Sequence, residues 1–482
     1  MSTPDTRRLH PGTIVLRIVA QAPKQVAGLV AMFAALSRGK TWVALAILGI
    51  WGAVMGIGTF LRWRQFSYTI GAGELTIAEG LVQRKRRSIP FDRIQDVSIE
   101  QGPLARVFGL AKVKVETGGG EADEATLDSV TLAEAARLRG VLRQGGQAGV
   151  AAAEAVPTPS AKRVIFAMPP ARVLTMGAFG FSLVWVGVLF AALNQIGDVI
   201  GFDWGEVRDI AGVARGQAMA LATPLFAAMA FVVALALGAA SGIVRTLLVE
   251  HGFRLEREGD RLRRVRGLLT RTEVVVALRR VQLALIERGM VSGRFGWSSL
   301  RFQTLGGSDD VGGRQAIAPF ARDGEVAALL AEAGYPRFDP LPLRPVAFGH
   351  VVRAGVLRGG VPLVAILIAS FFLPLIALAL VLVPIPVALA LMARRRHRYA
   401  IVGDTLQVMR GVLARQAWIV PLHRIQAVSV VRTPLQRLLG IATVRVGTAG
   451  ASGMARPDVV DLAVEDADAL AAALVRGAAG GR

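Results

Sequence analysis

The sequence predicts a multi-pass α-helical membrane protein that carries three β-rich modules, each a small curled antiparallel sheet or barrel with a C-terminal helix. Two observations lead to this fold class. Hydrophobic residues make up 53% of the 482 residues and the mean hydropathy is +0.49, whereas a soluble protein of this length is normally less apolar. The apolar residues also gather in blocks, and a related sequence pattern follows each pair of blocks.

The apolar blocks come in pairs, and a helix needs roughly 20 apolar residues to cross a bilayer. The last block, Ala354–Met392, is too long for one span and fits two short helices that turn near Pro374, or one long helix and one re-entrant piece. The sequence therefore predicts six spans in three hairpins. The first four spans are expected at Gln25–Ser37, Thr41–Leu61, Val173–Ile196 and Ala220–Val244.

Basic residues follow the second, fourth and sixth predicted spans, at Arg62–Arg64, Arg245–Arg257 and Arg394–Arg398. The loop Asn194–Ala218 instead holds more acidic than basic residues. Because an excess of Lys and Arg marks cytoplasmic loops, the three modules are expected in the cytoplasm of a bacterium, beside the inner membrane. The formal net charge of +21 favours contact with the anionic leaflet of that membrane.

One stretch of the sequence occurs three times. IPFDRIQDVSIEQGPLARVFGLAKVKVETGGG (Ile89–Gly120) returns as VPLHRIQAVSVVRTPLQRLLGIATVRVGTAGA (Val420–Ala451) and, with more changes, as VALRRVQLALIERGMVSGRFGWSSLRFQTLGG (Val276–Gly307). A catalytic motif would not need further copies, so we interpret the repeat as the spine of a folding module. Its shared core positions are Arg93, Arg280 and Arg424, then Gly80, Gly267 and Gly411, then Gly109, Gly296 and Gly440.

Within each module the pattern is typical of β-strands. Apolar and polar residues alternate through Phe66–Phe91, Val97–Gln101 and Ala111–Thr117, with glycines at the turns. The segment GPLARVFGL (Gly102–Leu110) begins with proline and stops at glycine, which predicts one short helical turn. A helical pattern then ends each module, at Leu132–Arg143, Asp323–Gly334 and Val464–Ala478.

This order of a glycine turn between strands, then IPFDRIQDV, PLARVFGL, VKVETGG and a final helix, resembles the bacterial pleckstrin-homology (PH) domain of type two. Three such domains, each after a membrane hairpin, resemble the YdbS/YdbT-like membrane protein family. The resemblance implies binding of lipid headgroups or protein segments, by analogy with other PH domains. The expected domains are hairpins at 14–62, 171–245 and 354–393, a linker at 144–170, and PH-like modules at 63–143, 246–336 and 394–480.

The repeated residues have two interpretations. Arg93, Arg280 and Arg424 could clamp a phosphate or carboxylate, because arginine offers a bidentate fork. We favour the alternative that they lock a turn by donating to backbone carbonyls inside each module. The repeated glycines are interpreted as turn residues with positive φ.

Basic clusters occur in the same hairpin of the first two modules. We predict that they contact anionic lipid, with a solvated strand face as the alternative. The third module has fewer charges in this hairpin and is expected to bind a protein or its sibling modules. The predicted lipid-contact residues are Arg84, Lys85, Arg86 and Arg87 in the first module and Arg261, Arg263, Arg264 and Arg266 in the second.

The sequence shows no catalytic constellation. It has no cysteine, the five histidines lack a metal-ligand spacing, and no phosphate-cradling loop opens a helix. We therefore expect no enzyme activity, no cofactor, no metal and no nucleic-acid partner. The predicted function is a non-enzymatic scaffold whose modules bind lipid headgroups, a protein partner or a second copy, with envelope stress as one setting. The alternative is a transporter or channel-like assembly with regulatory modules, although the clear spans carry no Asp, Glu or Lys.

Overall fold

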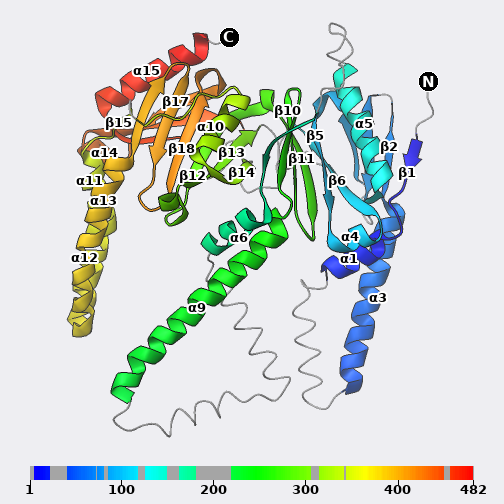
Figure 1. Cartoon of the computed structure of the whole chain (residues 1–482), viewed down its shortest axis with the longest axis horizontal. Coiled ribbons are helices and arrows are strands. Elements are labelled where there is room, and N and C mark those ends of the chain that lie inside the picture. Colours follow the sequence, from blue (N-terminus) through cyan, green and yellow to red (C-terminus); the bar gives the residue numbers. More distant parts are fainter. Residues whose placement is uncertain are drawn as a thin grey trace. The chain divides into compact units, whose positions relative to one another are not determined.

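The computed structural model describes residues 5–21, 41–71, 73–80, 85–117, 125–148, 162–180, 219–304, 314–340, 343–449 and 456–480 (Figure 1). These residues contain four β-sheets. The chain divides into two compact units. Unit 1 holds residues 1–166, 255–264 and 272–482, and unit 2 holds residues 167–254 and 265–271.

The expected fold class of a multi-pass α-helical membrane protein is wrong. The chain is β-rich, and among the described residues two helices are long and apolar enough to cross a membrane, Gly349–Phe371 and Leu378–Arg396. Whole-chain hydropathy counts strands buried within the modules, such as Val281–Arg288, together with apolar helices, so it does not by itself indicate a helical membrane protein. The PH-like modules themselves are present as sheets with helices.

The predicted spans have different outcomes. Thr41–Leu61 lies in helix α3 (Thr41–Gln65) and Ala220–Val244 lies in α9 (Met219–Glu250). Gln25–Ser37 and the part of Val173–Ile196 after Gly180 fall outside the described residues. The remaining elements outside the modules are β1 (Asp5–Arg7), α1 (Thr13–Gln21), β8 (Arg163–Ala167), α6 (Pro170–Phe179), β15 (Arg344–Pro345) and α11 (Gly349–Gly355).

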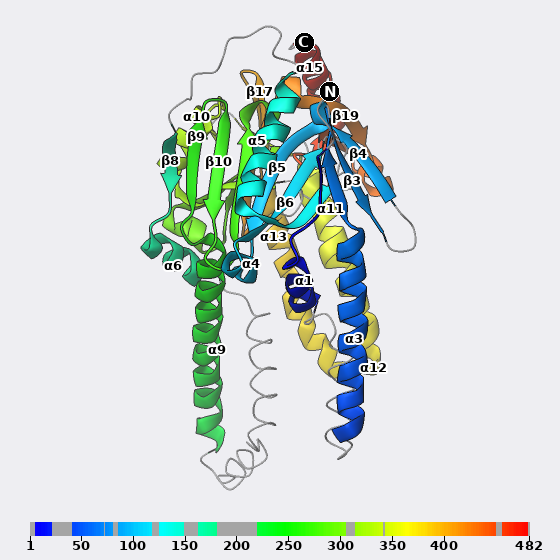
Figure 2. The same cartoon turned by 90° about the vertical axis from the view of Figure 1, so that its right-hand side faces the viewer.

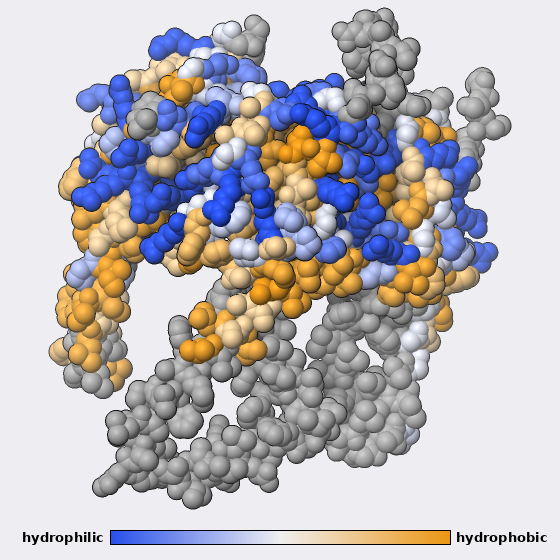
Figure 3. Space-filling model, in the orientation of Figure 1, coloured by the Kyte–Doolittle hydropathy of each residue, from blue (hydrophilic) through white to orange (hydrophobic). Residues whose placement is uncertain are grey.

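The last hairpin consists of short pieces. After α11 come a π-helical turn (Val356–Gly360), α12 (Val361–Phe372), a 3-10 segment (Pro374–Leu382) and α13 (Pro384–Arg396). Proline opens both later pieces, since its missing N–H costs nothing at a helix start. The turn near Pro374 is therefore as expected. Figure 3 shows hydrophobic side chains over the surface where α12 and α13 project.

Module 1 has a plan that the other two modules repeat. Three successive strands, which pair with the preceding short strand β1, β8 or β15, are followed by a 3-10 turn, three more strands and a C-terminal helix that packs on this second group of strands (Figure 2). Its elements are β2 (Ser67–Ile70), β3 (Glu74–Glu79), β4 (Lys85–Pro90), the turn Phe91–Arg93, β5 (Ile94–Gln101), α4 (Pro103–Val107), β6 (Leu110–Thr117), β7 (Ala125–Thr131) and α5 (Leu132–Ala148).

Modules 2 and 3 follow the same order. In module 2 the elements are β9 (Arg254–Glu258), β10 (Arg261–Arg266), β11 (Arg271–Ala277), the turn Leu278–Arg280, β12 (Val281–Arg288), the turn Ser292–Phe295, β13 (Trp297–Thr304), β14 (Arg314–Arg322) and α10 (Asp323–Glu332). In module 3 they are β16 (Arg398–Val402), β17 (Thr405–Arg410), β18 (Arg415–Pro421), the turn Leu422–Arg424, β19 (Ile425–Val431), α14 (Pro434–Leu438), β20 (Ile441–Thr448), β21 (Val459–Ala463) and α15 (Val464–Gly480).

The repeated glycines adopt the backbone that the sequence indicated. All six have positive φ, between 62° at Gly440 and 115° at Gly80. At Gly411 a Cβ would also collide with the carbonyl oxygen of Ala414, so no other residue fits that turn without a shift of the backbone.

Neighbouring modules share their sheets. The strand orders β7–β6–β5–β11–β10–β9–β8 and β14–β13–β12–β18–β17–β16–β15 each join the second sheet of one module to the first sheet of the next. At the second junction β12 pairs antiparallel with β18, from Ala284 opposite Ile419 to Arg288 opposite Arg415. The modules are therefore fused through backbone hydrogen bonds, and the predicted domain boundaries at 63–143, 246–336 and 394–480 stay predictions.

Side chains fill the second junction. Leu283 and Leu285 of β12 are fully buried and belong to the core of module 3, together with Trp418 and Val420 of β18. Module 3 therefore completes its core with residues of module 2, and the two modules form one folding unit at this place.

Candidate functional site

The basic strand of module 1 is exposed. Lys85, Arg86 and Arg87 lie on β4, which is the last strand of its sheet within the described part of the chain (Figure 2). Arg84 falls outside the described residues. The three described side chains can therefore reach an anionic surface, as the predicted lipid contact requires.

The basic strand of module 2 is different, because its arginines have partners within the protein. Arg264 is buried and donates to the carbonyl of Ala316 at 3.0 Å, and Arg266 pairs with Glu250 at 2.7 Å. Arg261 is half-buried. A buried guanidinium does not reach a headgroup, so the geometry favours a structural role for most of this strand.

Arg263 lies at the junction between module 1 and module 2. It contacts Glu256 at 3.0 Å and Glu273 at 2.8 Å, and Glu273 also pairs with Arg139 of α5 in module 1. Burial of Glu273 opposes its charged form, but the hydrogen bond from Arg263 and the charge of Arg139 together lower its pKa. These contacts join module 1 to module 2. The guanidinium group of Arg263 is bound to the two glutamates.

The repeated arginines lie at the ends of the 3-10 turns. Arg424 donates from Nη2 to the backbone carbonyl of Arg279 at 2.7 Å, and that carbonyl belongs to module 2. The sequence predicted a backbone acceptor within the same module, whereas the acceptor of Arg424 belongs to module 2. Arg93 of module 1 is exposed and Arg280 of module 2 is half-buried. Arg424 is therefore best explained as a residue that fastens module 3 to module 2.

We expect Arg424→Ala to destabilise the second junction by about 1–3 kcal/mol, because a charged donor to a backbone carbonyl is lost. The matched change Arg93→Ala should have a much smaller effect. Thermal unfolding of the two full-length variants measures the difference, and equal shifts would contradict the junction role.

Sequence reasoning missed a cluster that we call the arginine pocket, which consists of Arg288, Arg294, Arg396 and Arg415. These residues surround a cavity of about 130 Å³ at the second junction, and no acidic residue is among the described residues that line it. Arg288 comes from β12, Arg396 from the end of α13 and Arg415 from the start of β18. A second cavity of about 380 Å³ shares Arg288 and Arg415 and adds Asp323 and Arg337 to its lining.

The charges of the arginine pocket are poorly compensated. Arg288 donates to Asp323 at 2.8 Å, and Arg396 donates to the carbonyl of Val412. Partial burial and the neighbouring charges of Arg396 and Arg288 lower the pKa of Arg415. A bound anion would relieve this repulsion.

Apolar side chains surround the arginine pocket. Met290 and Met392 line it, and the nearby turn residues Val291, Phe295 and Leu413 are exposed, with Phe295 at 60%. Met392 and Arg396 lie in the last turns of Leu378–Arg396, a helix apolar enough to span a membrane. Arginines beside exposed apolar residues at such a helix end are typical of a membrane–water interface.

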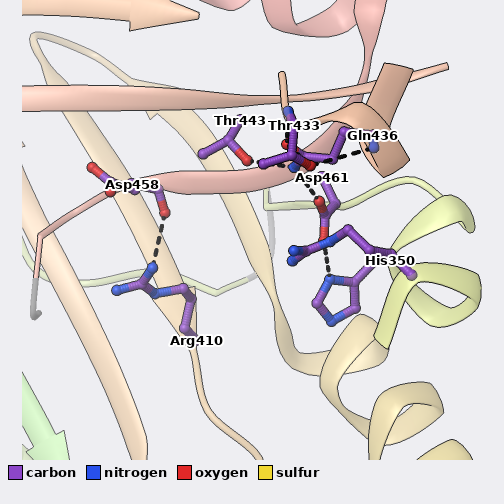
Figure 4. Close-up of polar contacts among 8 residues, drawn as sticks. His350, Arg410, Thr433, Gln436, Thr443, Asp458 and Asp461 are labelled. Carbon is purple, nitrogen blue, oxygen red and sulfur yellow. Dashed lines mark hydrogen bonds and ion pairs between the residues drawn. The ribbon is translucent and has the colours of Figure 1, made fainter. Parts of the chain in front are cut away.

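A separate polar cluster ties α11 to module 3 (Figure 4). Asp461 of β21 is fully buried and contacts His350 at 2.7 Å, Arg353 at 2.8 Å and Gln436 at 2.7 Å. Its backbone, at φ 60°, accepts a hydrogen bond from Ala347 at 3.1 Å. Asp461 is held by partners from α11 and α14, so we assign the cluster a structural role.

Within the described ranges, no group of three His, Asp or Glu side chains is placed to hold a metal ion. The cysteine-free chain offers no thiolate ligand. Among the described residues, the charged groups that we consider for ligand binding are therefore the arginines.

Comparison with known proteins agrees with this architecture. Three segments, 14–145, 203–334 and 361–477, match the family described as Bacterial PH domain, so the chain belongs to that family and carries three copies of its domain. It is similar to two proteins of Bacillus subtilis (strain 168) that are named UPF0699 transmembrane proteins. Similarity to YdbT is 26% identity over 331 residues, which is 64% of each chain, and similarity to YdbS is 31% over 101 residues, which is 19% of this chain and 62% of YdbS. The chain thus spans somewhat less than two thirds of either relative, and no solved structure matches it.

Proposed function

We propose that the protein is a non-enzymatic scaffold of a bacterial inner membrane whose row of PH-like modules binds the phosphate of anionic phospholipids, chiefly in the arginine pocket. The observation that carries the proposal is the cavity with four arginines and no acidic lining residue among the described ones. Its position at the end of α13 puts it at headgroup depth when Leu378–Arg396 spans the bilayer.

The chemistry of the pocket fits a phosphate group. Guanidinium groups bind phosphate oxygens through paired hydrogen bonds that are stronger than neutral ones. A cavity of about 130 Å³ holds a few water molecules at about 30 Å³ each, which is room for one phosphate. The adjoining Met290, Met392 and Leu413 suit the glycerol and upper acyl carbons of a lipid.

The first junction of the chain lacks the same charges. The residues that align with Arg288, Arg294, Arg396 and Arg415 are Gln101, Val107, Glu250 and Arg271. One arginine and one glutamate would give no net positive charge there. The exposed Lys85, Arg86 and Arg87 of β4 would add a weaker lipid contact, about 1 kcal/mol for each basic residue near an anionic surface.

The scaffold part of the proposal rests on the shared sheets, which hold successive modules in a fixed row. The arginine-rich segments after the predicted even-numbered spans favour a cytoplasmic side for the modules. Modules joined in this way would act on lipid together, so that weak contacts add.

Native mass spectrometry of the full-length protein tests the lipid site. Phosphatidylglycerol should bind more tightly than phosphatidylcholine, and the double change Arg396→Gln with Arg415→Gln should weaken phosphatidylglycerol binding about tenfold or more. Arg271→Gln is the matched control, because Arg271 is exposed and aligns with Arg415 at the other junction. It should leave binding unchanged.

Three outcomes would overturn this proposal. Equal binding of both lipids would remove the charge preference, and an equal loss in Arg271→Gln would remove the assignment to the pocket. Inorganic phosphate that binds as tightly as phosphatidylglycerol would show that the pocket takes a soluble anion.

A further inference from the structure

Within the described residues, the edge strand of the second sheet pairs with the next module in modules 1 and 2 but not in module 3. In modules 1 and 2, the second-sheet edge strands β5 and β12 continue into the first sheet of the next module through β11 and β18. In module 3 the corresponding strand is β19, and within the described part of the chain it ends the sheet β19–β20–β21. A strand edge that pairs twice in this chain is thus left with open hydrogen-bonding groups in its third copy.

The exposure of aligned side chains follows this pairing. Leu283 and Leu285 of β12 are fully buried by module 3, whereas the aligned Ala427 and Ser429 of β19 are exposed. Ser98 of β5 aligns with Ser429 and is 2% exposed. The two serines show that pairing, and not residue type alone, determines the burial of this position.

The open edge also lacks the usual protection. Soluble proteins guard an edge strand with charged side chains or proline, yet Ile425–Val431 contains neither. Beside β19 lies a cavity of about 310 Å³, lined mainly by apolar residues that include Ile425, Val428, Val475 and Ala478. These residues form a groove between β19 and the end of α15.

We propose that β19 binds the edge strand of a fourth bacterial PH module that belongs to a separate chain. The strand adds antiparallel to β19 in the register of β12 and β18. That register places Val428 opposite the partner residue that corresponds to Ile419, and Ser429 opposite the one that corresponds to Trp418. The carbonyl of His423 aligns with that of Arg279 and would accept the partner's repeated arginine, as Arg279 accepts Arg424.

The chemistry of the partner strand follows from the two internal junctions. Buried apolar residues occupy the middle of both incoming strands, Val274–Val276 in β11 and Ala417–Val420 in β18. The separate module must carry apolar residues there. The family contains a shorter protein, since the 101 matched residues make up 62% of YdbS, and YdbT occurs in the same organism.

A second copy of this chain fits the open edge less well. Within the described residues, β4 is the strand that corresponds to β11 and β18 but pairs with no other module, and it exposes Lys85, Arg86 and Arg87 where β18 has Gln416, Ala417 and Trp418. In the shared register Arg86 and Arg87 would lie against Val430 and Ser429, with no acidic residue on β19. Burying these basic side chains against the uncharged β19 is unfavourable. The basic β4 therefore disfavours the addition of another strand to module 1, whereas the uncharged β19 permits the addition of a strand to module 3.

Two labelled peptides and the full-length protein test the proposal by fluorescence anisotropy. One peptide has the sequence of Ala414–Leu422, which contains β18, and the other has the aligned sequence Gln83–Phe91, which contains β4. The β18 peptide should bind, and the double change Ala427→Lys with Ser429→Lys should weaken it at least tenfold, because lysine on the edge blocks strand addition. Ala472→Lys adds a charge at an exposed position of α15 and should leave binding unchanged. All variants should keep the thermal unfolding temperature, since the three positions are exposed.

Each alternative occupant has its own result. Stronger binding of the β4 peptide would show a contact between copies of this chain. A Ser429→Cys protein that forms a disulfide-linked dimer would show pairing of β19 with itself, and no other cysteine is present to confuse the result. Either outcome, or β18-peptide binding that survives the two lysines, would overturn the proposal.

Discussion

Leu285→Ala should lower the free energy of unfolding of the full-length protein by about 2–5 kcal/mol, the usual loss when a buried leucine leaves a cavity. Leu285 is fully buried and packs in the core of module 3, although it belongs to module 2. The change should therefore destabilise module 3 in particular. Denaturant unfolding followed by the fluorescence of the buried Trp418 would report the loss, with the other tryptophans replaced.

The matched control is Ser429→Ala, at the aligned position of β19. Ser429 is exposed, so its replacement should change the free energy of unfolding by less than about 0.5 kcal/mol. Equal effects at the two positions would show that Leu285 does not hold the junction.

Asp461→Asn should cost about 3 kcal/mol, because removing one member of a buried charge pair leaves the other uncompensated. Asp461 contacts Arg353 and His350 of α11 and Gln436 of α14, so α11 should detach from module 3. Asparagine keeps the size of the side chain and tolerates the positive φ of this position. Hydrogen exchange of α11 would show the detachment as faster exchange, while Asp466→Asn on the exposed side of α15 should leave it unchanged.

The same residue predicts an acid sensitivity. Burial disfavours the charged form of Asp461, but hydrogen bonds from His350 and Gln436 and the charge of Arg353 outweigh this effect and lower its pKa. A carboxyl with a lowered pKa stabilises the fold above its unfolded pKa of about 4, and this contribution is lost as the pH falls through the folded pKa. Unfolding measured between about pH 2 and pH 6 should show an acid loss that is smaller in Asp461→Asn. An identical acid loss in the variant would contradict the assignment.

The repeat and the internal plan of a module could be predicted from the sequence because both depend on local patterns. Alternating residues give the strands, and the glycines at positions such as 80 and 411 fix the turns by their positive φ. Strand β12 also held a signal for the junction. In VQLALI the face of Val281, Leu283 and Leu285 is wholly apolar, which is typical of a covered strand, whereas the residues aligned with Leu283 and Leu285 are Asp96 and Ser98 in β5 and Ala427 and Ser429 in β19.

The arginine pocket and the fold class could not be predicted from local sequence patterns, because both depend on how distant segments pack together. Arg396 and Arg415 were visible as basic residues near a predicted span, but Arg288 and Arg294 come beside them only through the pairing of β12 with β18. Hydropathy did not distinguish apolar helices from strands buried in protein, and within the described residues two helices, Gly349–Phe371 and Leu378–Arg396, are long and apolar enough to span a membrane. The number of basic residues in β10 also did not indicate that Arg264 is buried inside the module.

The pairing of β12 with β18 has a consequence for how the chain is made. The ribosome completes β12 before the helices α11 to α13, and β18 emerges only after them. The nascent chain therefore displays Leu283 and Leu285 until the segment Gly349–Arg396 has been made and β18 has paired with β12. Synthesis of this segment and closure of the sheet are consecutive steps, so a chain in which β18 fails to pair keeps an apolar edge that chaperones and proteases can recognise.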